Sequence, residues 1–131
     1  MIIRALKLAR GERGLVPYIS RTESVAYRHL TKKLTVETLW IYVLSLLTNG
    51  PLYGYEFPVK IEEKFGFRPN KITCYVVLYR LYQEGLIKEE KKMHSNEGPM
   101  RKYYQITEKG MRELENAVAF LRRVADVITP S

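Results

Sequence analysis

The apolar positions of residues 20–65 recur mostly at steps of three and four, which predicts a succession of helices. Ser20 and Glu23 have the spacing of a capping box, so we expect a first helix from there to about Leu34. A second helix is predicted over Thr35–Thr48, with its first residue as the N-cap. It has almost no polar face, and we therefore expect it to form the centre of the core.

A third helix is predicted to end at Phe65, because apolar side chains precede that residue at intervals of four. Leu52 can add a very short strand before it. Pro58 conflicts with a helix that starts at Tyr53, since proline lacks an N–H and clashes with the preceding turn. Two solutions are open: the helix begins near Phe57, or its first turn is distorted.

A fourth helix is predicted between Asn70, a good N-cap, and Gly85, a good C-terminal stop. The turn at residues 66–69 joins it to the third helix in a helix-turn-helix arrangement. Taken alone it is also an ordinary amphipathic helix. The face expected in the core carries Tyr75, Leu78, Leu81 and Tyr82. The face expected to point outward carries Asn70, Thr73, Val77, Arg80 and Glu84.

The pattern changes after this helix to two polar strands, residues 86–94 and 100–106, separated by a cluster of turn residues. A basic β-hairpin after a helix-turn-helix has the composition of a wing that lies against phosphates. The alternative is a solvated hairpin whose positive charges are balanced by glutamates. The cations that flank the turn are Lys91, Lys92, Arg101 and Lys102, and the glutamates are Glu89, Glu90 and Glu97.

Thr107 can cap a last helix whose apolar positions alternate steps of three and four, as in a heptad seam. One helix could pack on its own core, but about six turns exceed what so small a core needs. We therefore predict a homodimer through this seam, with Leu114, Val118 and Leu121 at its centre. The predicted interface consists of Met111, Leu114, Val118, Leu121, Ala125 and Ile128.

The net charge of +8 is concentrated near the N-terminus, because residues 1–34 carry +6. Residues 35–106 carry +2 and residues 107–131 are neutral. Nucleic acid or an anionic membrane surface would suit this asymmetry, and a solvated basic tail is the alternative. The first nineteen residues are interpreted as a basic arm, or else a disordered terminus, with cations at Arg4, Lys7, Arg10 and Arg13.

Composition argues against several classes of function. A single cysteine and two distant histidines predict no internal disulfide, no metal and no cofactor. The chain opens without a signal-peptide core, and its longest apolar run is far below the ~20 residues that span a bilayer, so we expect a cytoplasmic protein without a membrane partner. No phosphate-cradling glycine loop or carboxylate pair indicates an enzyme. Cys74 is interpreted as a small core residue, with redox sensing left open.

Five segments resemble the PadR family of winged-helix transcriptional regulators, named for phenolic acid decarboxylase repression. Residues 47–56 look like the family's leucine, glycine, proline, then His-Gly-Tyr-Glu opening, with Tyr53 in place of histidine. The family commonly has Gly-Thr-Leu-Tyr-Pro-Ala-Leu where this chain has Ile72–Leu78, so its DNA sequence preference does not carry over. The other similar segments are residues 73–75, 78–81, 84–87 and 98–110.

The resemblance extends from about Leu34 to Leu114. It implies a dimeric, repressor-type protein that binds a pseudo-palindromic promoter site. It also implies release, in some members, by a small-molecule effector held between the subunits. The basic segment before Leu34 lies outside the usual family core.

We therefore predict a mainly α protein with a small β-hairpin. Its architecture should be a winged helix-turn-helix with a long C-terminal dimerisation helix and an extra N-terminal basic arm and helix. The expected divisions are residues 1–34, 35–106 and 107–131. The predicted function is sequence-specific DNA binding by a transcriptional regulator, a repressor acting as a homodimer. The alternative is a winged-helix protein-protein interaction module.

Residues expected at the DNA have distinct roles. Thr73 should lie closest to the bases among the residues at the helix N-terminus, Val77 should offer a methyl contact, and Arg80 should meet a guanine edge or a phosphate. The wing should grip the backbone, and the basic arm should follow the minor groove. The full set is Asn70, Lys71, Thr73, Val77, Arg80, Lys92, Arg101, Lys102, Arg4, Lys7, Arg10 and Arg13.

Overall fold

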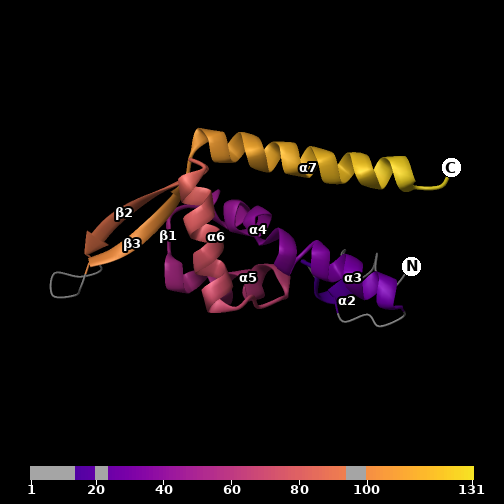
Figure 1. Ribbon diagram of the computed structural model, residues 1–131, viewed down its shortest axis with the longest axis horizontal. Helices are drawn as coiled ribbons and strands as arrows, with labels where there is room; N and C mark the ends of the chain where they lie inside the picture. The colour runs from indigo at the N-terminus through magenta and orange to yellow at the C-terminus, as the bar shows by residue number, and fades with distance from the viewer. Residues whose placement is uncertain (1–13, 20–23, 94–99) are drawn as a thin grey trace.

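The computed structural model of the chain describes residues 14–19, 24–93 and 100–131. Helices α4, α5 and α6 form a central body, a β-hairpin projects from it, and the long helix α7 runs beside α4 (Figure 1). The elements are α2 (Val16–Ile19), α3 (Val25–Lys33), the 3₁₀ turn η1 (Val36–Thr38), α4 (Leu39–Leu47), β1 (Leu52–Tyr53), the 3₁₀ turn η2 (Gly54–Glu56), α5 (Phe57–Phe65), α6 (Lys71–Gln83), β2 (Ile87–Met93), β3 (Met100–Ile106) and α7 (Glu108–Ile128).

The core lies around α4, as its apolar sequence predicts. Five of the nine residues of α4 are buried, and α5, α6, α7 and β3 all contact this helix. Side chains of α5 and α6 complete the same cluster, together with residues at the start of β2 and in β3. Its most completely buried members are Leu39, Val43, Leu44, Phe57, Ile61, Cys74, Leu78 and Ile87.

The predicted limits of α6 are confirmed. The Asn70 side-chain oxygen accepts a hydrogen bond from the Ile72 N–H at 2.7 Å, and Gly85 follows the helix with a φ of +76°. The Gly85 N–H donates to the Tyr82 carbonyl, and the Leu86 N–H donates to the Leu81 carbonyl, so the last turn keeps its acceptors occupied.

The predicted faces of α6 are wrong in part. The buried stripe runs through Cys74, Leu78 and Leu81, whereas Tyr75 and Tyr82 are 40% and 44% exposed. Tyrosines flank the stripe because their rings can cover its edge while their hydroxyls stay in water. Val77, predicted to point outward, is half-buried and packs against the core from the other edge of the stripe.

Helix α3 is capped by a residue other than the predicted one, and α4 has no side-chain N-cap. Helix α3 begins at Val25 with Ser24 as its N-cap, whose hydroxyl accepts from the Tyr27 N–H at 3.0 Å, and Ser20 and Glu23 lie outside the described residues. Thr35 does not cap α4. Its hydroxyl donates back to the Thr31 carbonyl at 2.6 Å, because Thr35 is buried at the C-terminal end of α3.

The conflict at Pro58 is resolved by the first of the two solutions. Helix α5 begins at Phe57, so the proline lies in its first turn, where a missing N–H removes no intrahelical bond. The 3₁₀ turn η2 takes the place of the earlier helical turn. The Glu56 carboxylate accepts a hydrogen bond from the Tyr53 N–H at 3.2 Å, which fixes the start of this turn.

The three strands form an antiparallel sheet in the order β1, β3, β2. The short strand predicted at Leu52 is confirmed and pairs Leu52 with Tyr104. Strands β2 and β3 pair from Ile87 opposite Ile106 to Met93 opposite Met100. Residues 94–99, with the predicted turn and Glu97, lie outside the described residues.

Helix α7 is anchored at its first turn, with Thr107 as the predicted N-cap. The Thr107 hydroxyl accepts from the Gly110 N–H at 3.0 Å and donates to the Gly85 carbonyl at 2.7 Å. Leu114 packs against the core of its own chain, so the first part of the seam is used within the subunit. Farther along, Phe120 and Ile128 are among the most exposed large apolar side chains.

The described N-terminal segment packs on the turn between α5 and α6. The Leu15 N–H donates to the Phe65 carbonyl at 3.0 Å, and Leu15 adds to the core. Tyr42 of α4 contacts Phe65 and Phe67 edge to face, with ring centroids 4.9 and 5.0 Å apart. In the described part of the chain, no helix has the length and apolar character needed to cross a membrane.

Candidate nucleic-acid interface

The outward surface of α6 differs from the predicted one. It is centred on Ile72, Val76 and Tyr79, which are 73%, 45% and 62% exposed. Arg80 and Gln83 border this surface. Helix α6 also carries Lys71 and contains no Asp or Glu, and Glu84 is its exposed C-cap.

The remaining residues predicted on α6 have different surroundings. Asn70 and Lys71 are exposed at the N-terminal end, and the Asn70 amide oxygen is engaged as the helix cap. Thr73 is half-buried at the edge of the exposed face, and Arg80 is exposed. The free N–H groups of the first turn add the positive end of the helix dipole to this region, which favours an anion there.

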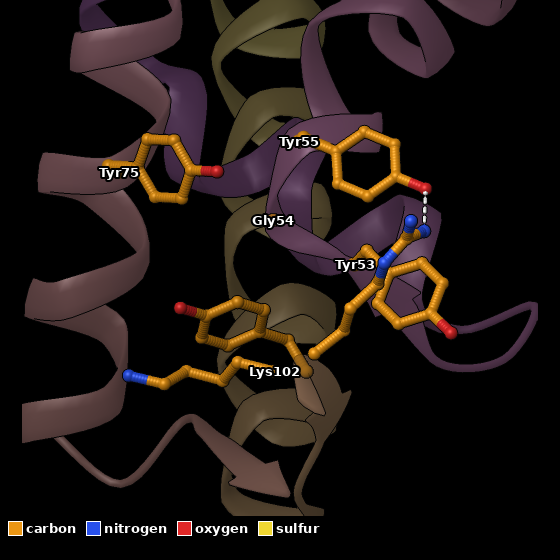
Figure 2. A pocket seen from close by; sticks show the side chains of 7 residues that line it. Tyr53, Gly54, Tyr55, Tyr75 and Lys102 are labelled. Atoms are coloured by element: carbon orange, nitrogen blue, oxygen red, sulfur yellow. Dashed lines mark hydrogen bonds between the residues drawn. The ribbon is translucent and has the colours of Figure 1, made fainter. Parts of the chain in front are cut away.

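A pocket of about 420 Å³ opens between α6, the turn η2 and strand β3, and we call it the tyrosine pocket. Tyr75 extends from α6 toward Gly54, as Figure 2 shows. A Cβ atom on residue 54 would lie 2.7 Å from Cε1 of Tyr75, so a larger residue there would force the Tyr75 ring to shift. The pocket is lined by Tyr53, Gly54, Tyr55, Tyr75, Arg101, Lys102 and Tyr104.

Arg101 is held in a defined orientation by two tyrosines of the pocket. Its guanidinium carbon lies 5.2 Å from the ring centroids of both Tyr53 and Tyr55, and those two rings stack 5.6 Å apart. A guanidinium nitrogen donates to the Tyr55 hydroxyl at 2.6 Å, as drawn in Figure 2. Cation-π contacts and this hydrogen bond restrict the side chain while leaving other guanidinium donors to face a ligand.

Tyr53 supports this arrangement from inside. Its hydroxyl accepts a short hydrogen bond from the Tyr103 hydroxyl, and the two rings contact each other with centroids 3.8 Å apart. Burial, with the hydrogen bond to Tyr103, raises the pKa of Tyr53 to about 12. The phenol therefore stays protonated at neutral pH and adds no negative charge beside Arg101.

The wing carries the predicted cations in pairs across its two strands. Lys92 lies opposite Arg101, and Lys91 lies opposite Lys102. Lys102 approaches the Glu89 carboxylate at 3.5 Å, and Lys92 approaches Glu90 at 3.8 Å. Exposed pairs of this kind contribute only ~0–1 kcal/mol and are readily exchanged for a phosphate.

The basic arm cannot be placed with the rest of the interface. The four cations predicted for it lie outside the described residues. Residues 14–19, the end of the predicted arm, pack at the C-terminal end of α5, next to the turn that leads into α6. These four residues are Arg4, Lys7, Arg10 and Arg13.

Cys74 is part of the packing of α6 against the core. The side chain is completely buried, and burial raises the pKa of its thiol to about 11. A protonated, inaccessible thiol is a poor nucleophile and a poor peroxide sensor, which argues for the core interpretation. Within the described ranges, no group of three His, Cys, Asp or Glu side chains is placed to hold a metal ion.

The sequence argument missed the tyrosine pocket, although one signal pointed toward it. Tyr53 and Tyr55 flank Gly54 in the chain, and a glycine between two aromatic residues indicates a close backbone approach. Pairing of β1 with β3 then brings Tyr103 beside Tyr53. This long-range pairing cannot be read from the local sequence.

Comparisons with known proteins agree with this architecture. Residues 43–116 match the transcriptional regulator PadR-like family, and no curated protein matches the chain. A PadR family transcription regulator of Clostridium difficile is 31% identical, with a TM-score of 0.61 over 69% of this chain and 93% of that one. A PadR-like transcriptional regulator of Bacillus cereus is 32% identical, with a TM-score of 0.59 over 70% of this chain and 88% of that one.

A third similar structure is the Bacillus subtilis PadR in complex with operator DNA. It is 26% identical, with a TM-score of 0.57, over 64% of this chain and 48% of that one. The matched family segment spans the region from α4 into α7 and includes the tyrosine pocket, the wing and α6. The chain therefore belongs to the PadR-like family of transcriptional regulators.

Proposed function

We propose that the protein is a sequence-specific repressor that binds double-stranded DNA at a pseudo-palindromic promoter site. The observation that carries this proposal is the joint placement of α6 and the wing. Helix α6 carries Lys71 and Arg80 on opposite sides of its exposed face, with Glu84 as its exposed C-cap, and Arg101 is oriented beside the helix by two tyrosines. The operator complex of a similar PadR supports the choice of DNA as the ligand.

The proposed contacts follow from position on the surface. Asn70, Lys71 and Thr73 lie at the N-terminal end of α6 and would bind phosphates, with Arg80 about two to three turns farther along. Lys92, Arg101 and Lys102 would bind the backbone beside the groove that receives α6. The basic arm would follow the adjacent minor groove, a role that stays a prediction for its four cations.

The experiment is selection of binding sites from a pool of random DNA duplexes, followed by affinity measurements at several salt concentrations. We expect an enriched inverted repeat with half-sites about 34 Å apart, one turn of DNA. The logarithm of the affinity should fall by about 0.9 per logarithmic unit of salt for each phosphate neutralised. No enriched sequence together with a flat salt dependence would reject DNA binding and favour the protein-interaction alternative.

We also propose that the protein acts as a homodimer through α7. This helix extends beyond the region where Leu114 packs on the core, and its later turns expose Phe120, Val124 and Ile128. Soluble chains rarely leave so many large apolar side chains on one helix in water, so a second copy is the proposed cover. Val118, half-buried, and Leu121, 37% exposed, lie between the two regions.

Two aspartates on the exposed part of α7 test the dimer. We expect Val124→Asp with Ile128→Asp to produce a monomer of unchanged helix content, since neither side chain is buried within the subunit. Sedimentation velocity measures the state, and circular dichroism checks the fold. The control, Asn116→Asp with Ala119→Asp, places two aspartates on the polar face and should remain dimeric. A dimer in both variants would place the interface elsewhere.

An apolar groove beside α7 supports the effector site that the family resemblance implies. Its volume is about 300 Å³, and Leu121 of α7 closes one side of it. We propose that an uncharged, largely apolar molecule binds here, because the described residues that line the groove include no charged side chain. The lining residues are Leu15, Tyr18, Tyr27, Leu30, Thr31, Leu34, Thr35, Thr38, Ile41, Tyr42 and Leu121.

A further inference from the structure

The outer face of α6 has an unusual chemistry for a helix that reads DNA. Near its N-terminal end, where recognition helices approach the bases, the outward side chains are Ile72 and Val76. Both are aliphatic and cannot form a hydrogen bond with a base edge. Tyr79 follows on the same face, and its hydroxyl accepts a hydrogen bond from the Gln83 amide at 2.9 Å.

Lys71 is exposed at this end of α6, whereas the other polar side chains there are engaged or lie away from the exposed face. The Asn70 amide oxygen accepts the Ile72 N–H as the helix cap, and Thr73 is half-buried at the edge of the exposed face. Tyr75 lines the tyrosine pocket and extends toward Gly54 (Figure 2). The first exposed guanidinium along the helix belongs to Arg80, two turns from the start.

From these observations we infer that Ile72 and Val76 determine specificity by contacting the 5-methyl groups of thymine in the major groove. The inference rests on the proposed function and names the bases recognised by the same surface. Thymine carries the one apolar group that an unmodified base pair presents in the major groove. An aliphatic side chain against cytosine or guanine would bury polar base atoms without partners, and this penalty selects for thymine.

The charges around the face favour DNA over a protein as its occupant. Lys71 and Arg80 lie on α6 itself, and Arg101 and Lys102 lie across the tyrosine pocket. Helix α6 itself contains no carboxylate, and Glu84, its exposed C-cap, lies about one turn beyond Arg80. A strip of aliphatic surface bordered by cations matches a groove whose floor carries methyl groups and whose edges carry phosphates. Because Val77 packs against the core while Ile72 and Val76 are exposed, the proposed methyl contact belongs to Ile72 and Val76 instead of Val77.

The experiment replaces thymine by uracil, a change that removes only the 5-methyl group. The probe is the duplex enriched by selection from random DNA, with uracil introduced at one thymine position at a time. We expect thymine at two or more positions of each half-site, and a loss of affinity of about 4-fold for each contacted methyl group. Uracil at positions outside the half-sites should leave the affinity unchanged.

Protein variants identify the side chain that meets each methyl group. Ile72→Ala and Val76→Ala should each bring the ratio of thymine to uracil affinity toward one at its own position. Both side chains are exposed, so the fold should persist. Val25→Ala, which shortens an exposed valine on α3, is the matched control and should keep the ratio of the parent protein.

Each result has a definite consequence. If the enriched half-sites bind equally well with thymine and uracil, the inference is wrong while the proposed function stands. The same holds if both alanine variants retain the full ratio, and the apolar face would then be assigned to a protein partner. If selection enriches no sequence, the proposed function and the inference both fail.

Discussion

Replacing Gly110 by alanine should destabilise the protein by about 2–4 kcal/mol, although alanine is the better helix former. Gly110 lies in the first turn of α7 and is buried against Leu86. A Cβ atom there would stand 2.1 Å from the Leu86 carbonyl oxygen and 2.8 Å from Cγ1 of Ile106. The Leu86 carbonyl accepts a hydrogen bond from the Thr107 N–H at 3.1 Å, so separating the chains would also break this bond.

Helix propensity alone predicts the opposite sign, a gain of about 1 kcal/mol for alanine in a helix. Urea unfolding followed by circular dichroism measures the difference, and Arg112→Ala is the control. Arg112 is exposed and lies two residues after Gly110, and its replacement should change the free energy of unfolding by less than about 0.5 kcal/mol. A Gly110→Ala protein as stable as the parent would show that α7 does not dock closely on Leu86.

The second large effect is expected at the wing. Arg101→Gln with Lys102→Gln should lower the affinity for the selected duplex by about 30-fold or more at moderate salt. The slope of the logarithm of affinity against the logarithm of salt concentration should become shallower by about 1.8, the contribution of two phosphates. The cause is the loss of two proposed phosphate contacts, one of which is oriented by Tyr53 and Tyr55.

The control removes the same net charge from a distant part of the chain. Arg122→Gln with Arg123→Gln alters exposed residues near the end of α7, which lies far from the wing in Figure 1. Titration of labelled duplex should show little change for this pair. Equal losses of affinity for both pairs would mean that the total charge determines the affinity and that the wing does not contact the DNA.

Local signals in the sequence predicted a feature correctly wherever residues close in the chain are sufficient to form it. Asn70 caps α6 through its own side chain, and Gly85 ends the helix by adopting a positive φ. Thr107 likewise caps α7. Pro58 marked the start of α5 because its ring excludes a preceding helical turn, although the sequence left two solutions open.

Local signals failed where a residue's role depends on what packs against it. The helical periodicity of apolar residues predicted Tyr75 in the core, but tertiary packing buries Cys74 and leaves Tyr75 to line the tyrosine pocket. Thr35 has the chemistry of an N-cap, yet its hydroxyl serves the preceding helix. Cys74 and Tyr75 are neighbours on one helix, and only the surrounding tertiary contacts determine which of the two is buried.

By itself, the sequence determined the order of helices and strands, the limits of α6 and the family of the chain, because caps, periodicity and short motifs act between residues close in the chain. Tertiary structure decided which side chains face outward, and therefore which residues are proposed to read DNA. The pairing of β1 with β3 and the docking of α7 on α4 bring together residues far apart in sequence. The strand pairing orients Arg101, and the packing of α6 against α4 and α5 leaves Ile72 and Val76 exposed; no local pattern contains that information.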